Sequence, residues 1–292
     1  MRPITSLLCI LLCIACVSKA NTLVPYNRWM DLPYSDSTQY SNELGEYAVG
    51  LSAVAYCPES EVADWSCLWC QRYPGVQIQK TYWDRWTSTF GYLAYDISLD
   101  WHILAFEGSQ DLLDWISNLQ IDELVPYKDH PDARVHHGFW VGYAKVRDQI
   151  LRDLVERNVS RLFLTGHSRG AAEATLAALD IREELGNISM TMVNFGSPRV
   201  GNQAYSSLFE SEMTGQSKWW RVTHARDPVP RLPPRLFGYY HISNEIWYPD
   251  NTLKYVVCPE PESPSCLDGM RFYPFATEDH VVYLDVPVSK CE

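Results

Sequence analysis

The stretch RLFLTGHSRGAAEATLAALDIREEL (residues 161–185) contains the pattern that decides the fold. The apolar run 161–165 predicts a strand, and the run after Gly170 is rich in alanine, leucine and glutamate, which predicts a helix. Between them stands a G-x-S-x-G pentapeptide with Ser168 at its centre. A serine on a sharp strand-to-helix turn presents its hydroxyl at the carboxyl end of a sheet, beside the free amides that begin the helix. The stretch therefore predicts a nucleophile elbow, in which those amides stabilise an oxyanion.

The flanking sequence extends this unit into an alternating series of helices and strands. Because helix and strand follow one another, the strands pair in parallel through crossover helices, which predicts the α/β class. Ligands of such sheets bind at the carboxyl ends of the strands, where Ser168 and the loop after Ala225 both lie. The predicted helices span 40–55, 138–157 and 169–185, and the predicted strands span 91–97, 101–106, 161–165, 190–195 and 219–225.

A lone serine is a poor nucleophile, so catalysis by Ser168 requires a general base and a carboxylate that orients this base. Asp227 follows the strand 219–225 and precedes a proline-rich loop, which places it at the same edge of the sheet as Ser168. His241 and His280 both follow Asp227 in the chain. Spacing and composition do not choose between these two histidines for the role of base.

The N-terminus predicts a leader for secretion. An apolar run at 7–17 follows Arg2, and Ser18 and Ala20 are small residues at the positions expected before a cleavage site. The run is too short to span a bilayer. We expect residues 1–20 to be a signal peptide and 21–292 to be one secreted domain, extracellular or in a secretory or lysosome-like compartment; the alternative is a buried N-terminal helix.

Composition limits the partners. The 292 residues are 46% hydrophobic and carry a formal net charge of −12. Such a chain builds an ordinary globular core, and its surface repels nucleic acid and anionic membranes but not neutral lipids or uncharged esters. We therefore expect no nucleic-acid partner and no stable insertion into a membrane.

The cysteines indicate disulfides. Three of the nine lie in the expected leader, and an even six remain, which in a secreted protein predicts three bonds. The C-x-x-C pair Cys67 and Cys70 is also typical of redox or zinc sites, but no second pair of this kind or nearby pair of histidines accompanies it. Two N-x-S triplets, at Asn158 and Asn187, are candidate glycosylation acceptors. The six cysteines are Cys57, Cys67, Cys70, Cys258, Cys266 and Cys291.

Several longer motifs resemble the fungal-type (class 3) lipases of the α/β-hydrolase superfamily, over roughly residues 45 to 291. They are the G-H-S-x-G pentapeptide around Ser168, NFGSPRVGN at 194–202, DPVPRLPP at 227–234 and VHHGF at 135–139. The resemblance implies the α/β-hydrolase fold, a mostly parallel central sheet with helices on both faces.

The resemblance also assigns roles. It implies that Asp227 is the acid, that His280 in D-H-V-V-Y is the base and that His241 is a supporting residue. It implies an oxyanion hole at Gly108-Ser109, completed by the backbone N–H of Arg169. Ser109 can alternatively cap the next helix. For the disulfides it implies the pairs Cys57–Cys291, Cys67–Cys70 and Cys258–Cys266.

Two residues depart from the family pattern. Arg169 stands where a leucine is usual after the nucleophile, and Glu107 stands where an arginine is common. The backbone N–H at 169 does not depend on the side chain, so the oxyanion hole is expected to persist. We expect the two charges to pair with each other, and we expect Arg169 to influence substrate preference.

The segment 110–119 is predicted to be a short amphipathic helix directly after the oxyanion residue. In the lipases that the chain resembles, this segment is a lid whose apolar face covers the site in water and turns outward at an oil surface. An ordinary core helix is the alternative. The apolar residues of the segment are Leu112, Leu113, Trp115, Ile116 and Leu119.

Together these features predict a secreted serine carboxyl-ester hydrolase, foremost a triacylglycerol lipase that works through an acyl-enzyme. Its partner is a lipid or ester at an oil–water interface, and the chemistry requires no metal and no organic cofactor. The alternatives are a phospholipase A1 or an aryl or feruloyl esterase on the same scaffold, or a non-catalytic binding protein.

Overall fold

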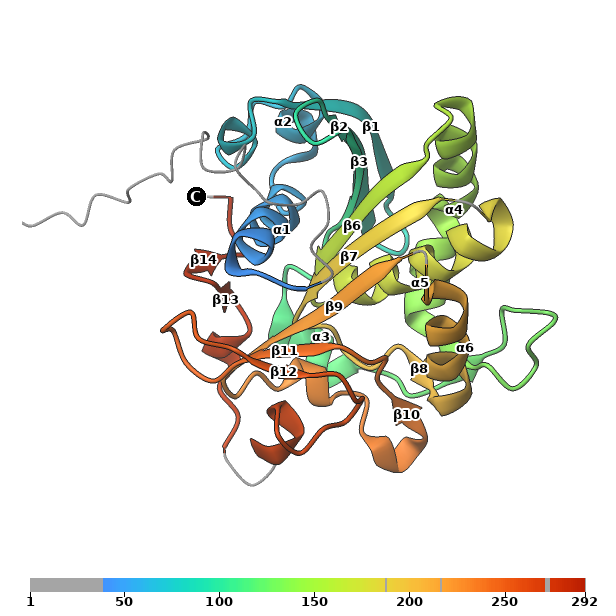
Figure 1. The fold of residues 1–292 in the computed structure, drawn as a ribbon, viewed down its shortest axis with the longest axis vertical. Helices are drawn as coiled ribbons and strands as arrows, with labels where there is room; N and C mark the ends of the chain where they lie inside the picture. The colour runs from blue at the N-terminus through green and yellow to red at the C-terminus, as the bar shows by residue number, and fades with distance from the viewer. Residues whose placement is uncertain (1–38, 187, 216, 271–273, 292) are drawn as a thin grey trace, which may run out of the picture.

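The computed structural model describes residues 39–186, 188–215, 217–270 and 274–291 (Figure 1). The expected signal peptide and the sequon asparagine Asn187 lie outside the described residues. Within the described part, the search for a helix long and apolar enough to cross a membrane finds none.

The described chain contains six α-helices and fourteen strands. The helices are α1 (Asn42–Val54), α2 (Glu59–Ala63), α3 (Leu112–Asn118), α4 (His137–Glu156), α5 (Arg169–Leu185) and α6 (Gln203–Met213). The main sheet holds β1 (Val76–Asp84), β2 (Thr89–Asp96), β3 (Trp101–Phe106), β6 (Arg161–His167), β7 (Ser189–Phe195), β9 (Lys218–His224), β11 (Glu245–Tyr248) and β12 (Val256–Cys258). The short strands are β4 (Glu123–Leu124), β5 (Val135–His136), β8 (Gly201–Asn202), β10 (Tyr239–Tyr240), β13 (Val282–Tyr283) and β14 (Val286–Pro287).

The main sheet has the order β1-β2-β3-β6-β7-β9-β11-β12. Its five central strands, from β3 to β11, pair in parallel, and the outer pairs β1–β2, β2–β3 and β11–β12 are antiparallel. The helices α4, α5 and α6 lie between successive parallel strands in the chain, which is how parallel strands must be connected. The predicted α/β class and the mostly parallel sheet are confirmed.

Helices cover both faces of this sheet (Figure 1). On one face, α1 contributes Leu44, Val49 and Leu51 to a core that also holds Phe163 of β6. On the other face, α4 and α5 pack together over a second core. The inner side of α5 is rich in alanine, and these small side chains let the helix lie close to the strands; they are Ala172, Ala174, Ala177 and Ala178, all fully buried.

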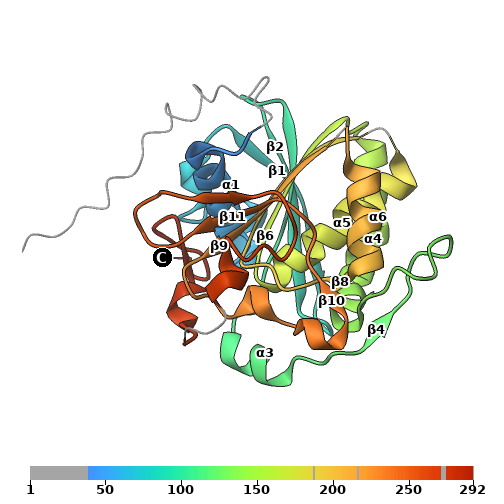
Figure 2. The ribbon, with the colours of Figure 1, turned by 60° about the horizontal axis from the view of Figure 1, so that its bottom comes forward.

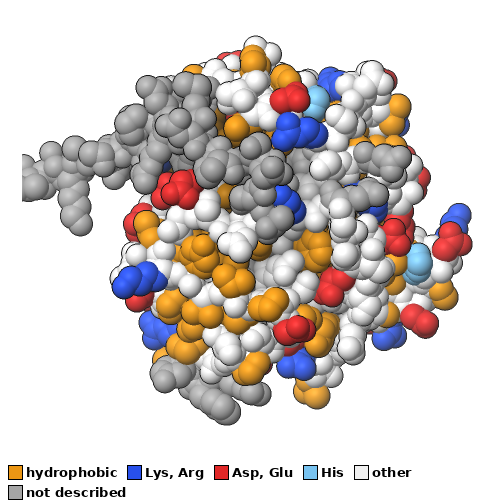
Figure 3. Space-filling model, viewed as in Figure 1, with side chains coloured by type: hydrophobic (Ala, Val, Ile, Leu, Met, Phe, Trp, Pro, Cys, Tyr) orange, Lys and Arg blue, Asp and Glu red, His pale blue; other side chains and the backbone are white. Residues whose placement is uncertain are grey.

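The carboxyl edge of the sheet gathers the predicted site residues. Ser168 directly follows β6, and Asp227 follows β9, the second strand along from β6. Figure 2 shows α3 lying across this edge of the molecule. On the face seen in Figure 3, the described lysine and arginine side chains are scattered among the acidic ones rather than gathered in one patch.

Candidate active site

Ser168 occupies a strained turn between β6 and α5. Its backbone has φ 59° and ψ −128°, a conformation that side-chain-bearing residues rarely adopt. The turn is held because the Ser168 N–H donates to the carbonyl of Phe195 (2.9 Å) and the Ser168 carbonyl accepts from the Ala171 N–H (3.0 Å). This is the turn that the sequence predicts, with Ser168 at the amino end of a helix.

Close backbone approach explains the glycine two residues later. A Cβ atom placed on Gly170 would lie 2.3 Å from the Phe106 carbonyl oxygen, so any other residue would force the end of β3 away from the elbow. Gly108, two residues after the end of β3, also lies against the turn. A Cβ atom on Gly108 would lie 3.1 Å from Ser168 Cβ. The Gly108-Ser109 segment is therefore adjacent to the nucleophile.

Asp227 and His280 form a buried hydrogen-bonded pair. His280 Nδ1 donates to Asp227 Oδ2 at 2.8 Å, and the two residues are 1% and 0% exposed. Asp227 Oδ1 accepts from the Val229 N–H at 2.8 Å, and Oδ2 also accepts from the Tyr283 hydroxyl. These donors hold the carboxylate in place and fix the imidazole tautomer, which leaves His280 Nε2 without a proton and able to accept one.

His280 lies in an irregular segment that side-chain contacts hold in place. Asp279 accepts from the Arg226 N–H through its carboxylate (2.9 Å), and its carbonyl lies 3.0 Å from His224 Nδ1. The His280 carbonyl accepts from His167 Nε2 (2.7 Å). These three contacts attach the segment to the carboxyl ends of β9 and β6, so a histidine more than fifty residues after Asp227 reaches it.

The buried imidazole of His167 joins the segment of His280 to the first core. His167 Nδ1 lies 2.7 Å from the Tyr56 hydroxyl, and burial lowers the pKa of His167 well below its usual value. The ring is therefore neutral, donating from Nε2 to the His280 carbonyl and accepting at Nδ1 from Tyr56. Sequence reasoning missed the roles of His167, Tyr56, Asp279 and Tyr283, although the last two stand within the D-H-V-V-Y motif.

Gly196 makes room for the acid and the base. It follows β7 with φ +55°, and a Cβ atom there would lie 2.9 Å from His280 Cε1 and 3.0 Å from Asp227 Oδ2. Its neighbour Phe195 accepts the hydrogen bond from the Ser168 N–H. One tight turn therefore touches all three predicted triad residues and draws them to one point.

Two reactive atoms at this point have no partner. Ser168 Oγ and His280 Nε2 are both buried, and neither has a hydrogen-bond partner among the described residues. Unsatisfied buried polar atoms are costly and uncommon away from functional sites. The arrangement brings a hydroxyl and an imidazole nitrogen, both without partners among the described residues, to one turn, and proton transfer from a nucleophile to a base needs such a pair of groups.

His241, the other histidine considered, supports the loop that follows Asp227. Its Nε2 donates to the Pro230 carbonyl at 2.6 Å, and its backbone N–H donates to Glu262 Oε1 at 2.9 Å. Arg199 makes a two-pronged pair with Glu262 (2.8 and 2.7 Å) and also donates to the carbonyl of Pro233. Burial and Arg221 lower the pKa of His241 well below its usual value, so it stays neutral.

The supporting role predicts the outcome of His241→Ala. The substitution leaves the Pro230 carbonyl buried without its donor, which costs about 1–3 kcal/mol of unfolding free energy. We expect a lower midpoint in urea with kcat within a few-fold of wild type at low temperature. Tyr240→Ala, at the neighbouring half-buried position, is the control. Loss of turnover from a variant that remains fully folded would instead place His241 in the chemistry.

The candidate oxyanion donors are positioned by the same elbow. Arg169 is the first residue of α5, and the first backbone N–H groups of a helix have no acceptor within it. Ser109 is half-buried at the end of the segment that touches Ser168. The next helix is capped by the Asp111 side chain, which accepts from the Asp114 N–H at 3.1 Å. Asp111, rather than Ser109, is therefore the N-cap of α3.

The Arg169 side chain does not pair with Glu107 as the sequence predicts. Its guanidinium donates to the carbonyls of Thr87 and Ser88, in the turn between β1 and β2, and its Nε lies 3.6 Å from Glu173 Oε1. Glu173 is completely buried one helical turn along α5; burial raises its pKa to about 7, and Arg169 opposes this rise. Glu107 accepts from Gln110 Nε2 at 2.8 Å instead. The i, i+4 spacing on α5 explains the preference for Glu173.

The predicted lid is a helix, α3, but one of its apolar residues faces solvent. Trp115 stacks on Phe139 of α4, with ring centroids 6.2 Å apart, and Leu119 packs against the second core. Ile116 is half-buried, whereas Leu113 is 66% exposed, which corrects its assignment to the covering face. The side chain of Leu112 lies outside the described part.

A cavity of about 350 Å³ opens beside this helix. Trp115, Leu119, Phe139 and Arg169 line it, so it reaches from α3 to the residue after the nucleophile. Beyond the helix, His136 Nε2 lies 2.7 Å from the Gln120 carbonyl and anchors the chain.

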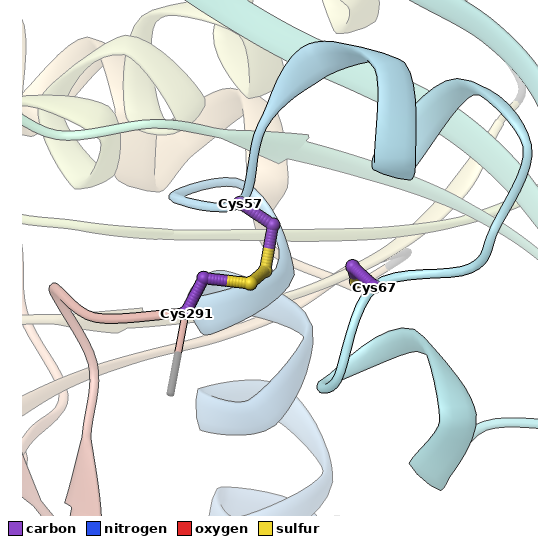
Figure 4. A group of neighbouring side chains, drawn as sticks. All are labelled: Cys57, Cys67 and Cys291. Carbon is purple, nitrogen blue, oxygen red and sulfur yellow. A yellow bond between two sulfur atoms is a disulfide. The ribbon is translucent and has the colours of Figure 1, made fainter.

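The described residues contain three disulfides, and these join the pairs that the resemblance implies. Cys57–Cys291 links the end of α1 to the C-terminal segment across 234 positions, whereas Cys67–Cys70 and Cys258–Cys266 are local. The sulfurs of Cys57, Cys67 and Cys291 lie within 4.8 Å of one another. Figure 4 shows the Cys57–Cys291 bond with Cys67 near it. Because all three are oxidised, this cluster offers no thiolate to a metal.

Comparisons with known proteins agree with this geometry. The model of the family "Lipase (class 3)" matches residues 103–237. The lipase of Rhizomucor miehei is 32% identical over 266 residues, 87% of this chain and 71% of that protein. The lipase of Rhizopus niveus is 30% identical over the same length, which is 66% of that protein, so this chain spans about two thirds of it. The secreted mono- and diacylglycerol lipase A of Penicillium cyclopium is 39% identical over 166 residues, 55% of this chain and 52% of that protein.

Solved structures extend the likeness to the fold. Lipase II of Rhizopus niveus superposes with a TM-score of 0.79 at 27% identity, covering 87% of this chain and 98% of that one. A triacylglycerol lipase whose catalytic centre is described as a serine protease triad superposes with a TM-score of 0.78 at 29% identity, with the same coverage. With an α/β-hydrolase fold and this extent of similarity, the chain belongs to the class 3 lipase family.

Proposed function

We propose that this protein is a secreted serine hydrolase of carboxyl esters, with glycerides of fatty acids as its main substrates. The observation that carries the proposal is the meeting of Ser168, Asp227 and His280 around the turn at Gly196. Each member has the environment that its role needs: a buried hydroxyl on a strained turn, a buried imidazole nitrogen with no partner among the described residues, and a carboxylate with several donors.

In the proposed reaction, Ser168 Oγ attacks the ester carbonyl while His280 Nε2 takes its proton. Asp227 stabilises the imidazolium that forms, and the Tyr283 hydroxyl stabilises the carboxylate. The Arg169 N–H and the Ser109 residue donate to the developing oxyanion. His280 then gives its proton to the leaving alcohol, and water activated by the same imidazole hydrolyses the acyl-enzyme.

Glycerides are favoured as substrates by the apolar surroundings of the site. Trp115, Leu119 and Phe139 line the cavity beside the nucleophile turn, which suits an acyl chain. The names of the relatives, a lipase and a secreted mono- and diacylglycerol lipase, point to the same class and to secretion. Phospholipids and aryl or feruloyl esters are the substrates that the test must separate from glycerides.

The proposal predicts activation at an oil surface. In this structure the nucleophile is 1% exposed, and α3 rests on α4 through Trp115 and Phe139. Opening α3 would expose Trp115, and fully burying a large apolar side chain is worth about 1.5–3 kcal/mol, so an emulsion can offset the cost of opening. We expect activity to rise steeply once tributyrin exceeds its solubility.

Trp115→Ala is expected to weaken this rise and to leave hydrolysis of short soluble esters intact. Leu68→Ala, an exposed apolar residue in the Cys67–Cys70 turn, is the matched control and should behave as wild type. The assay compares emulsified triglyceride, phospholipid vesicles and p-nitrophenyl esters. A smooth saturation curve through the solubility limit, with short esters preferred to emulsions, would exclude the lipase and support an esterase.

A further inference from the structure

The turn between α4 and β6 carries the triplet Asn158-Val159-Ser160 on the surface. Asn158 and Ser160 are both exposed, and Asn158 follows the end of α4 with φ +51°. The turn lies at the amino end of β6, whereas Ser168 follows its carboxyl end, so the two are at opposite edges of the sheet (Figure 1). A bulky group on Asn158 would therefore leave the candidate active site free.

The left-handed backbone at position 158 is sufficient to explain an asparagine there, because asparagine is favoured in this conformation after helices. A glycan is not needed to explain the residue. A second observation concerns the space beside it. A cavity of about 360 Å³ adjoins Asn158 and Ser160 and is walled by side chains of the three neighbouring strands β1, β2 and β3. This is near the small end of ligand pockets, about 300–1,000 Å³, and has room for one or two sugar rings.

The wall of this cavity combines aromatic and polar groups. The rings of Tyr95 and His102 lie against each other with centroids 4.9 Å apart. Burial and then Arg157 lower the pKa of His102, so its imidazole is neutral at pH 7. Neutral aromatic rings beside hydrogen-bonding groups match a pyranose, which has an apolar C–H face and a rim of hydroxyls.

A β-bulge supplies a further polar group. The β1–β2 pairing passes from Ile78–Ala94 directly to Lys80–Leu93, so Gln79 is the extra residue. Bulges re-aim side chains and are frequent next to functional sites. Gln79 lines the cavity, and its Oε1 is buried with no hydrogen-bond partner among the described residues. Rotation of the Gln79 side chain toward the cavity would present this acceptor to the N–H of an acetamido sugar.

We propose that Asn158 carries an N-linked glycan and that this cavity holds its first N-acetylglucosamine. In the transfer, Asn158 Nδ2 forms a bond to C1 of the sugar and loses a proton. The bond from C1 to the pyrophosphate of a polyprenyl-linked oligosaccharide donor breaks, and the lipid pyrophosphate leaves. The inference rests on the proposed secretion, because that donor is met in the secretory pathway.

The packing of this turn indicates that the glycan is transferred to Asn158 before the turn folds. Val159 is 7% exposed, and its N–H donates to the Leu154 carbonyl at 3.0 Å. The Ser160 carbonyl accepts from the Ser189 N–H at 2.9 Å, which ties the turn to the start of β7. The folded turn thus holds the middle of the sequon inward, so modification precedes the docking of β6 and β7.

The first test is the mass of the secreted protein from a eukaryotic host, measured before and after peptide-N-glycosidase treatment with peptide mapping. We expect the Asn158 peptide to be modified in the wild type and unmodified in Ser160→Ala, which keeps Asn158 but breaks the sequon. Asn187→Gln, at the other sequon, should retain the Asn158 glycan. An unmodified Asn158 peptide in secreted wild-type protein would overturn the proposal.

A second preparation, with a host leader placed before residue 21, separates this inference from the proposed secretion. If the protein is secreted only with the host leader, its own residues 1–20 do not direct secretion. Peptide mapping of the host-leader preparation still shows whether Asn158 carries a glycan. Failure of esterase activity in a glycosylated protein would count against the proposed function alone.

The place of the sugar is tested on protein trimmed by endoglycosidase to a single N-acetylglucosamine. We expect its Tm to exceed that of Ser160→Ala by about 2–4 °C, a modest shift for a domain of this size. The difference should shrink in the Gln79→Ala background, since the acetamido group would lose its acceptor. Equal melting temperatures with and without the sugar would show that the glycan does not occupy the cavity.

Discussion

Ser168→Ala is expected to reduce ester hydrolysis by about a million-fold, the loss typical when the nucleophile of a serine triad is removed. The acyl-enzyme cannot form without Oγ, and the remaining donors of the oxyanion hole support only slow attack by water. Stability should change little, because Ser168 Oγ makes no hydrogen bond with the described residues and alanine meets the same backbone strain as serine. His280→Ala should lose a comparable factor.

Two measurements check this prediction. A fluorophosphonate probe should label wild-type protein at the peptide containing Ser168 and should leave Ser168→Ala unlabelled. Turnover of p-nitrophenyl butyrate by equally purified samples gives the factor, with Ser60→Ala, at an exposed serine of α2, as the control. Activity above a few per cent in Ser168→Ala, or a label on another residue, would remove Ser168 from the mechanism.

Replacing Cys57 and Cys291 together by serine is expected to cost about 5 kcal/mol of unfolding free energy. The bond closes a loop of 234 positions, and the chain-entropy estimate rises with loop length. The same estimate gives about 2.5 kcal/mol for Cys258–Cys266, which spans 8 positions and serves as the matched comparison. Both are upper values, because residual structure in the unfolded chain reduces them.

The double replacement is necessary because of the neighbouring bond. A single substitution would leave one thiol within 4.8 Å of Cys67 Sγ, where it can attack the Cys67–Cys70 disulfide and scramble the pairing. Urea unfolding at constant pH measures the loss, and non-reducing peptide maps show that the other two bonds remain. A loss for Cys57–Cys291 no larger than for Cys258–Cys266 would contradict the loop-length argument.

Local patterns in the sequence were sufficient for much of the fold. The apolar run before Ser168 and the alanine-rich run after it specify β6 and α5, because both elements bury one continuous face. The strand β1 was not predicted. It lies at the edge of the sheet, much of it is exposed, and its bulge at Gln79 interrupts the alternation on which a strand prediction depends.

Local sequence patterns predicted less of the candidate site than of the fold. Asp227 was found because it follows a strand and precedes prolines, whereas the choice of His280 over His241 needed the resemblance. His280 sits in an irregular segment and is placed by contacts of Asp279 and Tyr283 with residues more than fifty positions away. No period or spacing along the chain encodes such contacts. The Arg169–Glu107 pairing was wrong for a different reason: it joined two residues that flank the site, whereas the i, i+4 spacing on α5 places Glu173 beside Arg169.

The buried pair of Arg169 and Glu173 limits how this chain can evolve. Arg169→Leu alone would restore the residue usual in the family but remove the cation that opposes the rise in the pKa of Glu173, so the buried carboxyl would take up a proton. Losing Glu173 alone would leave Arg169 Nε without its carboxylate, while the rest of the guanidinium would still donate to the carbonyls of Thr87 and Ser88. A change at residue 169 therefore also changes the charge state of residue 173, and the two positions are best exchanged together.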